Sequence, residues 1–290
     1  MFTTTEILKK VRELEIKSKK LTRHIFTGEY HSAFKGRGML FKEVREYHHG
    51  DDVRFIDWNV SARFNHPFSK VFEEERELTI MLLVDISPSV YFGTGDQWKN
   101  EWIAELCAVL GFSALQNNDK VGLILFTDRI EMYIPPKKGR QHLLRIIREL
   151  LYFEPTGKKT DINVPLEYMS NVIKKKCIAF VLSDFISKNF EQTLRIASRR
   201  HDVIGMHIHD PAESVLPDAG LVKMRDAETN KVMLVDTSDP GVRHAYALSY
   251  AHRVLDFKEQ FKRNQTDTMS LATDQSYIQE LHRFFKQRAS

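Results

Sequence analysis

Residues 80–89 have the sequence Ile80-Met81-Leu82-Leu83-Val84-Asp85-Ile86-Ser87-Pro88-Ser89. The five apolar side chains before Asp85 are typical of a strand that is buried on both faces of a parallel sheet. Open α/β sheets bind ligands at the carboxyl ends of their strands, so the loop after this strand is a candidate site. One carboxylate and two hydroxyls in that loop suit a hard cation such as Mg²⁺, which prefers few carboxylates and retains waters.

Two later stretches place similar groups after other predicted elements. Lys159-Thr160-Asp161-Ile162 opens a helix after a loop, and Phe180-Val181-Leu182-Ser183-Asp184 is a second apolar strand that ends in a carboxylate. Taken alone, an Asp/Ser cluster after a strand fits equally well a turn in which these side chains bond their own backbone. The three stretches together favour a cation site.

The order of these three stretches resembles that of the von Willebrand factor A domain. The metal-ion-dependent adhesion site of that domain uses a D-x-S-x-S motif, a threonine and a further aspartate. The resemblance implies the metal ligands Asp85, Ser87, Ser89 and Thr160, with Asp184 bound directly or through one water. It implies Mg²⁺ as the ion, with Mn²⁺ or Ca²⁺ as alternatives.

A second resemblance covers roughly residues 35 to 240. Its motifs are Gly36-Arg37-Gly38, Arg45-Glu46-Tyr47, the run from Gly50 to Trp58, Ser61-Ala62-Arg63, His209-Asp210-Pro211-Ala212-Glu213, Leu216-Pro217, Gly220 and Asp226-Ala227-Glu228-Thr229. Together they resemble the bacterial domain-of-unknown-function family fifty-eight. This resemblance implies a MoxR-type AAA+ ATPase as partner, and the adhesion-type site implies a partner carboxylate on the metal. We therefore expect a metal-dependent protein-binding adaptor that is not an enzyme.

Two other function classes fit the sequence less well. A Mg²⁺-dependent phosphohydrolase could use Asp85 as a nucleophile, but Ser87 stands where such enzymes carry a second aspartate as acid/base. Nucleic-acid binding could use the basic face of a helix predicted over residues 6–23. However, a solvated face accounts for that charge, and a net charge of +4 over 290 residues predicts no nucleic-acid partner.

Composition predicts a folded protein in the cytoplasm. Hydrophobic residues make up 42% and charged residues 28% of the chain, as in ordinary globular domains. The longest apolar runs have five to six residues, far below the roughly 20 of a membrane span, so we expect no transmembrane segment. Met1–Glu6 does not begin a secretory signal. Cys107 and Cys177 are expected to be buried thiols and not a disulfide.

Strands that alternate with helices through residues 78–210 predict an α/β fold, a doubly wound and mostly parallel sheet like that of the von Willebrand factor A domain. Residues 1–75 are predicted to form an N-terminal helix and strand extension packed on the core, and residues 76–215 the A-like domain. Residues 216–290 then supply a hairpin (221–224 and 232–235) and helices over 243–263 and after Asp274.

Two strands remain to be assigned, and two clusters of side chains allow more than one interpretation. Val53–Trp58 alternates as a half-exposed strand does, and Val203–His209 reads as the last strand of the sheet. His207 and His209 share one face of that strand, so they could bind zinc, although no third ligand is near them in sequence. Carboxylates at Asp51, Asp52 and Asp57, with His48 and His49, could form a second cation site; turn capping and pairing with Arg54 and Arg63 is favoured.

Overall fold

The computed structural model describes residues 11–17, 39–74, 77–94, 98–187, 189–225 and 231–289. The chain divides into two compact units. One comprises residues 1–33 and 78–290, and the other is Phe34–Glu77. The predicted division at residues 75 and 215 stays a prediction.

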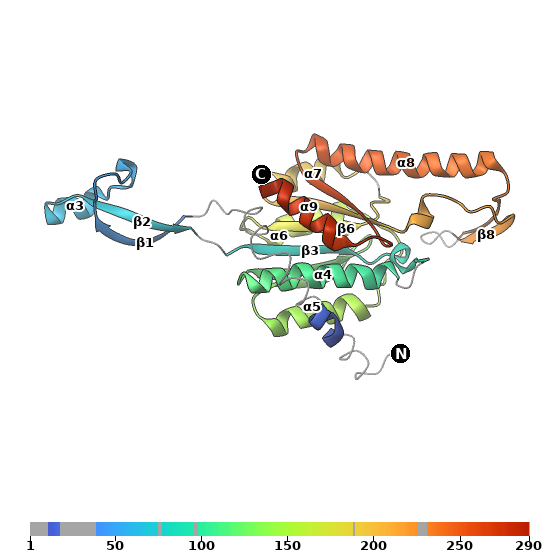
Figure 1. Ribbon diagram of the computed structural model, residues 1–290, viewed down its shortest axis with the longest axis horizontal. Coiled ribbons are helices and arrows are strands. Elements are labelled where there is room, and N and C mark those ends of the chain that lie inside the picture. Colours follow the sequence, from blue (N-terminus) through green and yellow to red (C-terminus); the bar gives the residue numbers. More distant parts are fainter. Residues whose placement is uncertain are drawn as a thin grey trace. The chain divides into compact units, whose positions relative to one another are not determined.

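The larger unit is built on a six-stranded sheet with the strand order β10-β7-β6-β3-β4-β5 (Figure 1). Its strands are β3 (Thr79–Asp85), β4 (Lys120–Phe126), β5 (Ile130–Lys137), β6 (Ile178–Ser183), β7 (Asp202–His209) and β10 (Asp267–Ala272). All neighbours pair in parallel except β4 and β5, which are antiparallel. The predicted α/β fold with a doubly wound, mostly parallel sheet is confirmed.

The chain leaves β3 in one direction to reach β4 and β5, and later returns to the other side of β3 with β6. The sheet therefore has its topological switch point between β3 and β6, where the loops after two adjacent strands diverge and leave a crevice. Leu82 of β3 pairs with Leu123 of β4 on one side and Phe180 of β6 on the other. This register brings the carboxyl ends of β3 and β6 together.

Helices cover both faces of the sheet, with α4 and α5 on one side and α7 and α8 on the other (Figure 1). They are α4 (Lys99–Gln116), α5 (Arg140–Tyr152), α6 (Asn163–Val172), α7 (Glu191–Ser198), α8 (Pro240–Arg263) and α9 (Tyr277–Ala289). On one face, Met81 and Leu83 of β3 share a buried cluster with Leu166 of α6 and Phe257 of α8. Burial on both faces explains why β3 reads as a continuous apolar run.

The parallel sheet extends one strand further than the sequence predicts. Val203–His209 is not the last strand, because β10 pairs with β7 beyond it and forms the edge. Only Met269, Leu271 and Ala272 of β10 are buried, so its sequence alternates with polar residues and lacks the apolar run of the central strands. The C-terminal hairpin was predicted correctly, as β8 (Leu221–Arg225) antiparallel to β9 (Val232–Asp236).

The smaller unit contains an antiparallel pair, β1 (Met39–Glu46) and β2 (Phe68–Glu74). Between them, the predicted strand Val53–Trp58 is wrong: Val53–Phe55 is a 3₁₀ turn (η1) and Trp58–Phe64 is helix α3. The carboxylates of Asp52 and Asp57 cap these two elements by accepting backbone N–H groups, which explains why helical turns replace the strand.

The acidic residues of this unit are turn caps and ion-pair partners, as favoured from the sequence. Asp52 pairs with Arg54 at 2.6 Å, whereas Asp51 pairs with Arg45 at 2.8 Å. Asp57 lies 3.4 Å from Lys70, and among the described residues it forms no ion pair with Arg63, which the sequence had suggested.

Two other expectations can be compared with the described residues. Cys107 and Cys177 are buried free thiols, as predicted. Residues 11–17 of the predicted basic helix are helical, and the remainder of residues 6–23 lies outside the described part of the chain. Among the described residues, no helix is both long and apolar enough to cross a bilayer.

Candidate metal centre

Two acidic residues lie at the switch point of the sheet. Asp85 is the last residue of β3, and Asp184 directly follows β6. The two strands are paired in parallel up to Val84 and Leu182, so their carboxyl ends are adjacent. Asp85 is completely buried and Asp184 is 8% exposed. Two carboxylates therefore share a site with little solvent to screen them.

The Asp85 carboxylate is held by hydrogen bonds to both of its oxygens. Its Oδ1 accepts the Ser87 N–H at 2.9 Å, and its Oδ2 accepts the Ser183 hydroxyl at 2.6 Å. Ser183 in turn accepts the Phe185 N–H at 3.0 Å. Burial first, and then the negative charge of Asp184, raises the pKa of Asp85 to about 7. The site is thus rigid and short of positive charge.

Ser87 and Ser89 are brought together by the turn after β3. A short 3₁₀ element (η2, Pro88–Tyr91) follows Ser87, and the Oγ atoms of the two serines lie 3.0 Å apart. Ser87 is completely buried. The geometry therefore brings Asp85, Ser87 and Ser89 into one oxygen-lined loop.

Thr160 comes from a separate loop that is tied to the neighbouring strand end. The Ile86 N–H donates to Phe126 O at the end of β4, and the Asp161 N–H donates to Thr127 O one residue further on. Gly157 lies so close to Thr127 that a Cβ at this position would overlap its side chain. Thr160 is 8% exposed, and its Oγ1 is buried with no hydrogen-bond partner among the described residues. A buried hydroxyl without a partner is costly, so this atom suits a metal ion or a water.

A third carboxylate fixes the Thr160 loop. Glu131 on β5 accepts hydrogen bonds from the side chains of Thr127 and Thr156 and from the backbone N–H groups of Thr156 and Gly157. Burial acts to raise the pKa of Glu131, but these four donors outweigh it, and the net pKa is lowered. Glu131 therefore positions the loop and was not recognised from the sequence.

A buried lysine accompanies Asp184. Lys99 is 1% exposed, and its Nζ lies 3.8 Å from Asp184 Oδ2 and 2.6 Å from Glu213 Oε1. Asp184 Oδ1 accepts the Ile186 N–H at 3.1 Å, while its Oδ2 has no hydrogen bond within the described residues. Lys99 begins α4, where a cation opposes the helix dipole, so the two carboxylates and not the helix account for its position.

The motif His209–Glu213 connects these groups. Asp210 accepts hydrogen bonds from the backbone and hydroxyl of Thr94, which follows the Ser87–Ser89 loop, and from the Thr273 hydroxyl. Glu213 accepts the Asp210 N–H at 3.0 Å while it pairs with Lys99. No role for this motif follows from the sequence, because its partners Thr94 and Lys99 lie more than one hundred residues away in the chain.

The two histidines of β7 do not form a zinc site with the described residues. Their rings are stacked with centroids 4.9 Å apart, and His207 Nδ1 lies 3.1 Å from the Ser270 hydroxyl. Burial lowers the pKa of both, that of His207 to about 3, so both are neutral. In the described residues, no three His, Cys, Asp or Glu side chains are grouped as metal ligands, at β7 or near Asp51. The oxygen site around Asp85 has hydroxyls in place of a third such ligand.

Comparisons with solved structures give only weak overall likenesses. An aerotolerance-related membrane protein from Bacteroides fragilis is 14% identical, covers 73% of this chain and 98% of its own, and has a TM-score of 0.49. The SpRpn10 VWA domain is 10% identical, covers 71% and 93%, and has a TM-score of 0.40.

Comparisons of sequence are more informative. The uncharacterized protein Rv1480 of Mycobacterium tuberculosis is 29% identical over 96% of this chain and 88% of its own length. The uncharacterized protein YeaD of Bacillus subtilis is 30% identical over 37% of this chain and 25% of its own. The family model described as "Protein of unknown function DUF58" matches residues 43–254. This chain therefore belongs to the DUF58 family.

Proposed function

We propose that this protein is a metal-dependent protein-binding adaptor. In this proposal Mg²⁺, or Mn²⁺ or Ca²⁺, binds to Asp85, Ser87, Ser89 and Thr160, with Asp184 as a direct or water-mediated ligand. The ion supplies an open coordination position, which a carboxylate of a partner protein occupies. Oxygen ligands of this mixed kind are those that Mg²⁺ accepts.

The observation that carries the proposal is an excess of buried negative charge. Asp85, Asp184 and Glu213 contribute three carboxylates, and Lys99 contributes one ammonium, which already pairs with Glu213. Buried charges are costly unless they are paired, so with all three carboxylates ionised this arrangement leaves two charges to be balanced. Protonation of Asp85, whose pKa is raised to about 7, balances one of them when no cation is bound. One divalent cation beside Asp85 would balance both and would satisfy the buried Thr160 hydroxyl.

For the partner we propose a MoxR-type AAA+ ATPase, in line with the family resemblance of the sequence. The adaptor would act with this ATPase in assembling or activating other proteins in the cytoplasm. A phosphohydrolase that uses Asp85 is less well supported. Both Asp85 oxygens already accept hydrogen bonds, the residue has no exposed surface, and the required second acid is replaced by Ser87.

A capture experiment tests the proposed partnership. The tagged chain is incubated with extract containing the MoxR-type ATPase, with Mg²⁺ or with a chelator. We expect capture by the wild type with Mg²⁺ and loss of capture with chelator. Thr160→Val should lose it too, because the variant removes one ligand while keeping the side-chain shape.

Thr268→Val is the matched control, since Thr268 lies on β10 at the far edge of the sheet. It should capture the ATPase as well as the wild type does. Capture of the ATPase that persists both with chelator and in Thr160→Val would contradict the proposed adhesion mechanism.

A further inference from the structure

A strongly cationic cavity lies at the end of the sheet opposite to the proposed metal centre. It has a volume of about 560 Å³. Its walls come from the segment before β6, the end of α7 with the start of β7, the α8–β10 connection and α9. Asp202 and Asp267, the first residues of β7 and β10, line it, so the cavity faces the amino ends of the strands. The proposed metal centre lies at their carboxyl ends.

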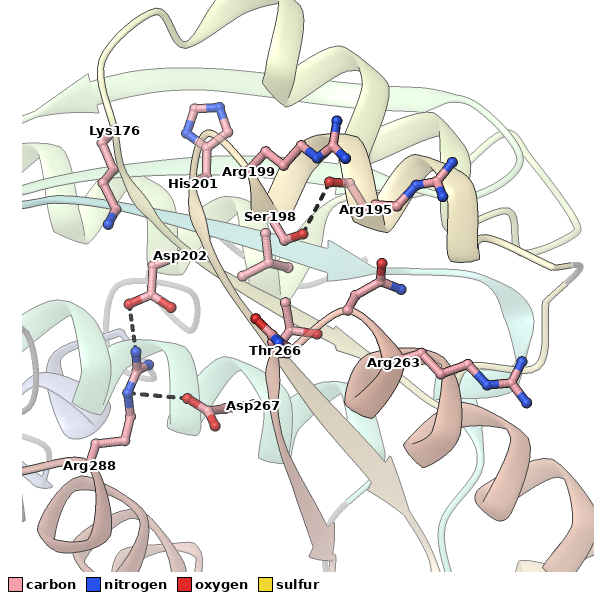
Figure 2. A pocket seen from close by; sticks show the side chains of 13 residues that line it. Lys176, Arg195, Ser198, Arg199, His201, Asp202, Arg263, Thr266, Asp267 and Arg288 are labelled. Carbon is pink, nitrogen blue, oxygen red and sulfur yellow. Dashed lines mark hydrogen bonds and ion pairs between the residues drawn. The ribbon is translucent and has the colours of Figure 1, made fainter.

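Five cationic side chains line this cavity against two carboxylates. Figure 2 shows Lys176, Arg199 and Arg195 along one side, with Arg288 across from them. Arg288 forms ion pairs with both carboxylates, at 2.7 Å from Asp202 and 3.3 Å from Asp267. Arg263, the fifth cation, pairs with Glu191 and Glu259, which lie outside the lining.

The remaining three cations have no acidic partner among the residues that the structure describes. Lys176, Arg195 and Arg199 form no ion pair with any residue of the described ranges. Arg195 and Arg199 are four residues apart at the end of α7, which places them on one face of the helix, where like charges repel each other. An anion bound between them would turn this repulsion into attraction.

Helix dipoles do not account for the charge. The C-terminal ends of α7, α8 and α9 line the cavity, and each carries about half a negative charge, or about 1.5 in total. The cationic excess of the lining exceeds that value, and it still does so when Arg263 is discounted because of its two glutamate partners.

A buried histidine is among the residues that line the cavity. His201 is 2% exposed and its Nδ1 lies 3.2 Å from the Sγ of Cys177. Burial raises the pKa of Cys177 to about 12, so the thiol keeps its proton and can donate it to Nδ1. The hydrogen of the ring then resides on Nε2, a buried atom with no partner among the described residues. The ring is therefore neutral and adds no charge to the lining.

We infer that this cavity binds the phosphate chain of a small oligophosphate, either free or as the tail of a nucleotide. Guanidinium groups bind phosphate oxygens in bidentate geometry, and each phosphate supplies about 1.5 to 2 negative charges in a small volume. A volume of 560 Å³ suits a small ligand. The lining has no Phe, Tyr or Trp on which a base could stack, so recognition rests on the phosphates.

Calorimetry with inorganic tripolyphosphate, ATP and AMP on the full chain in metal-free buffer tests this inference. We expect tripolyphosphate and ATP to bind and AMP to bind much more weakly. The double variant Arg195→Ala/Arg199→Ala should weaken tripolyphosphate binding about tenfold or more, because it removes two charge-assisted contacts. It should not lower the melting temperature, because neither side chain has an ion-pair partner among the described residues and the two charges repel each other.

The matched control is Arg225→Ala/Arg283→Ala, which removes two arginines outside the cavity lining. It should bind tripolyphosphate as the wild type does. Tighter binding of ATP than of tripolyphosphate assigns the site to a nucleotide, and the reverse assigns it to a free chain; both support the inference. Three results would overturn it: no binding to the wild type, equal weakening in the control, or AMP binding as tightly as tripolyphosphate.

Discussion

Lys99 supplies the positive charge beside the carboxylates of the candidate metal centre. Its ammonium is almost completely buried between Asp184 and Glu213. A buried ion pair adds little net stability compared with apolar packing, but removing one partner leaves the other charge uncompensated. Lys99 therefore lowers the free-energy cost of burying the two carboxylates. Its own charge would also limit how strongly the site attracts a metal.

We predict that Lys99→Met lowers the free energy of unfolding by about 3 kcal/mol in the presence of chelator. Asp184, which is buried, and Glu213, which is partly buried, would then lack their cation. The double variant Lys99→Met/Glu213→Gln should lose clearly less, because one of the stranded charges is also removed. Urea unfolding followed by tryptophan fluorescence measures both variants and the single variant Glu213→Gln. If the double variant is as unstable as the sum of the two single variants, Lys99 and Glu213 are not coupled.

At the scale of elements, the Thr160 loop depends on the strand pair β4 and β5. Glu131 on β5 holds Thr156 and Gly157, and Thr127 after β4 holds Asp161. The loop hydroxyl is thus positioned by an anchor outside the candidate ligands. Because the anchor is a carboxylate with a lowered pKa, its strength depends on pH.

The pKa of Glu131 in the folded protein is below its ordinary value of 4.5. Its stabilising contribution is therefore present above about pH 4.5 and is lost as the pH falls through the lower, folded value. We predict that Glu131→Gln is less stable than the wild type at pH 7 and loses less stability on acidification. Thermal unfolding between pH 7 and pH 3 measures this. Glu280→Gln, on α9, serves as control and should follow the wild type; parallel curves for all three proteins would contradict the anchor role.

The sequence predicted the central strands, which are buried on both faces, but it missed one edge strand and misassigned the helical turns over residues 53–58. The apolar runs of β3, β4, β6 and β7 identify the sheet and its strand ends. β10 was missed because an edge strand alternates between buried and polar residues. Residues 53–58 were misassigned, because Asp52 and Asp57 act as caps for helical turns there.

In the candidate site, the residues that are close in sequence were predicted, and the contacts between distant residues were not. Asp85, Ser87 and Ser89 are close in sequence, so one strand-to-loop pattern was enough to place them together. Lys99 and Glu213 are far apart in the chain, and nothing in their spacing predicts that their side chains meet at 2.6 Å. Such contacts follow from the register of the sheet, which sequence periodicity does not specify.

At the scale of the whole sheet, the carboxyl ends and the amino ends of the strands suit ligands of opposite charge. Buried carboxylates and hydroxyls gather at the carboxyl ends of β3 and β6, and unpaired cations gather at the amino ends of β7 and β10. The carboxyl ends suit a divalent cation, and the amino ends suit an oligophosphate. Because a full sheet separates them, the two proposed sites can be tested independently.

The most direct test of the metal centre is titration calorimetry of metal-free protein with Mn²⁺ and Mg²⁺. We predict one binding site in the wild type, and at least about tenfold weaker binding in Asp85→Asn, which keeps the side-chain shape but removes the charge. Asp236→Asn, which removes an exposed carboxylate of the β9 hairpin, should bind as the wild type does. Equal binding by the wild type and Asp85→Asn would contradict a metal centre built on Asp85.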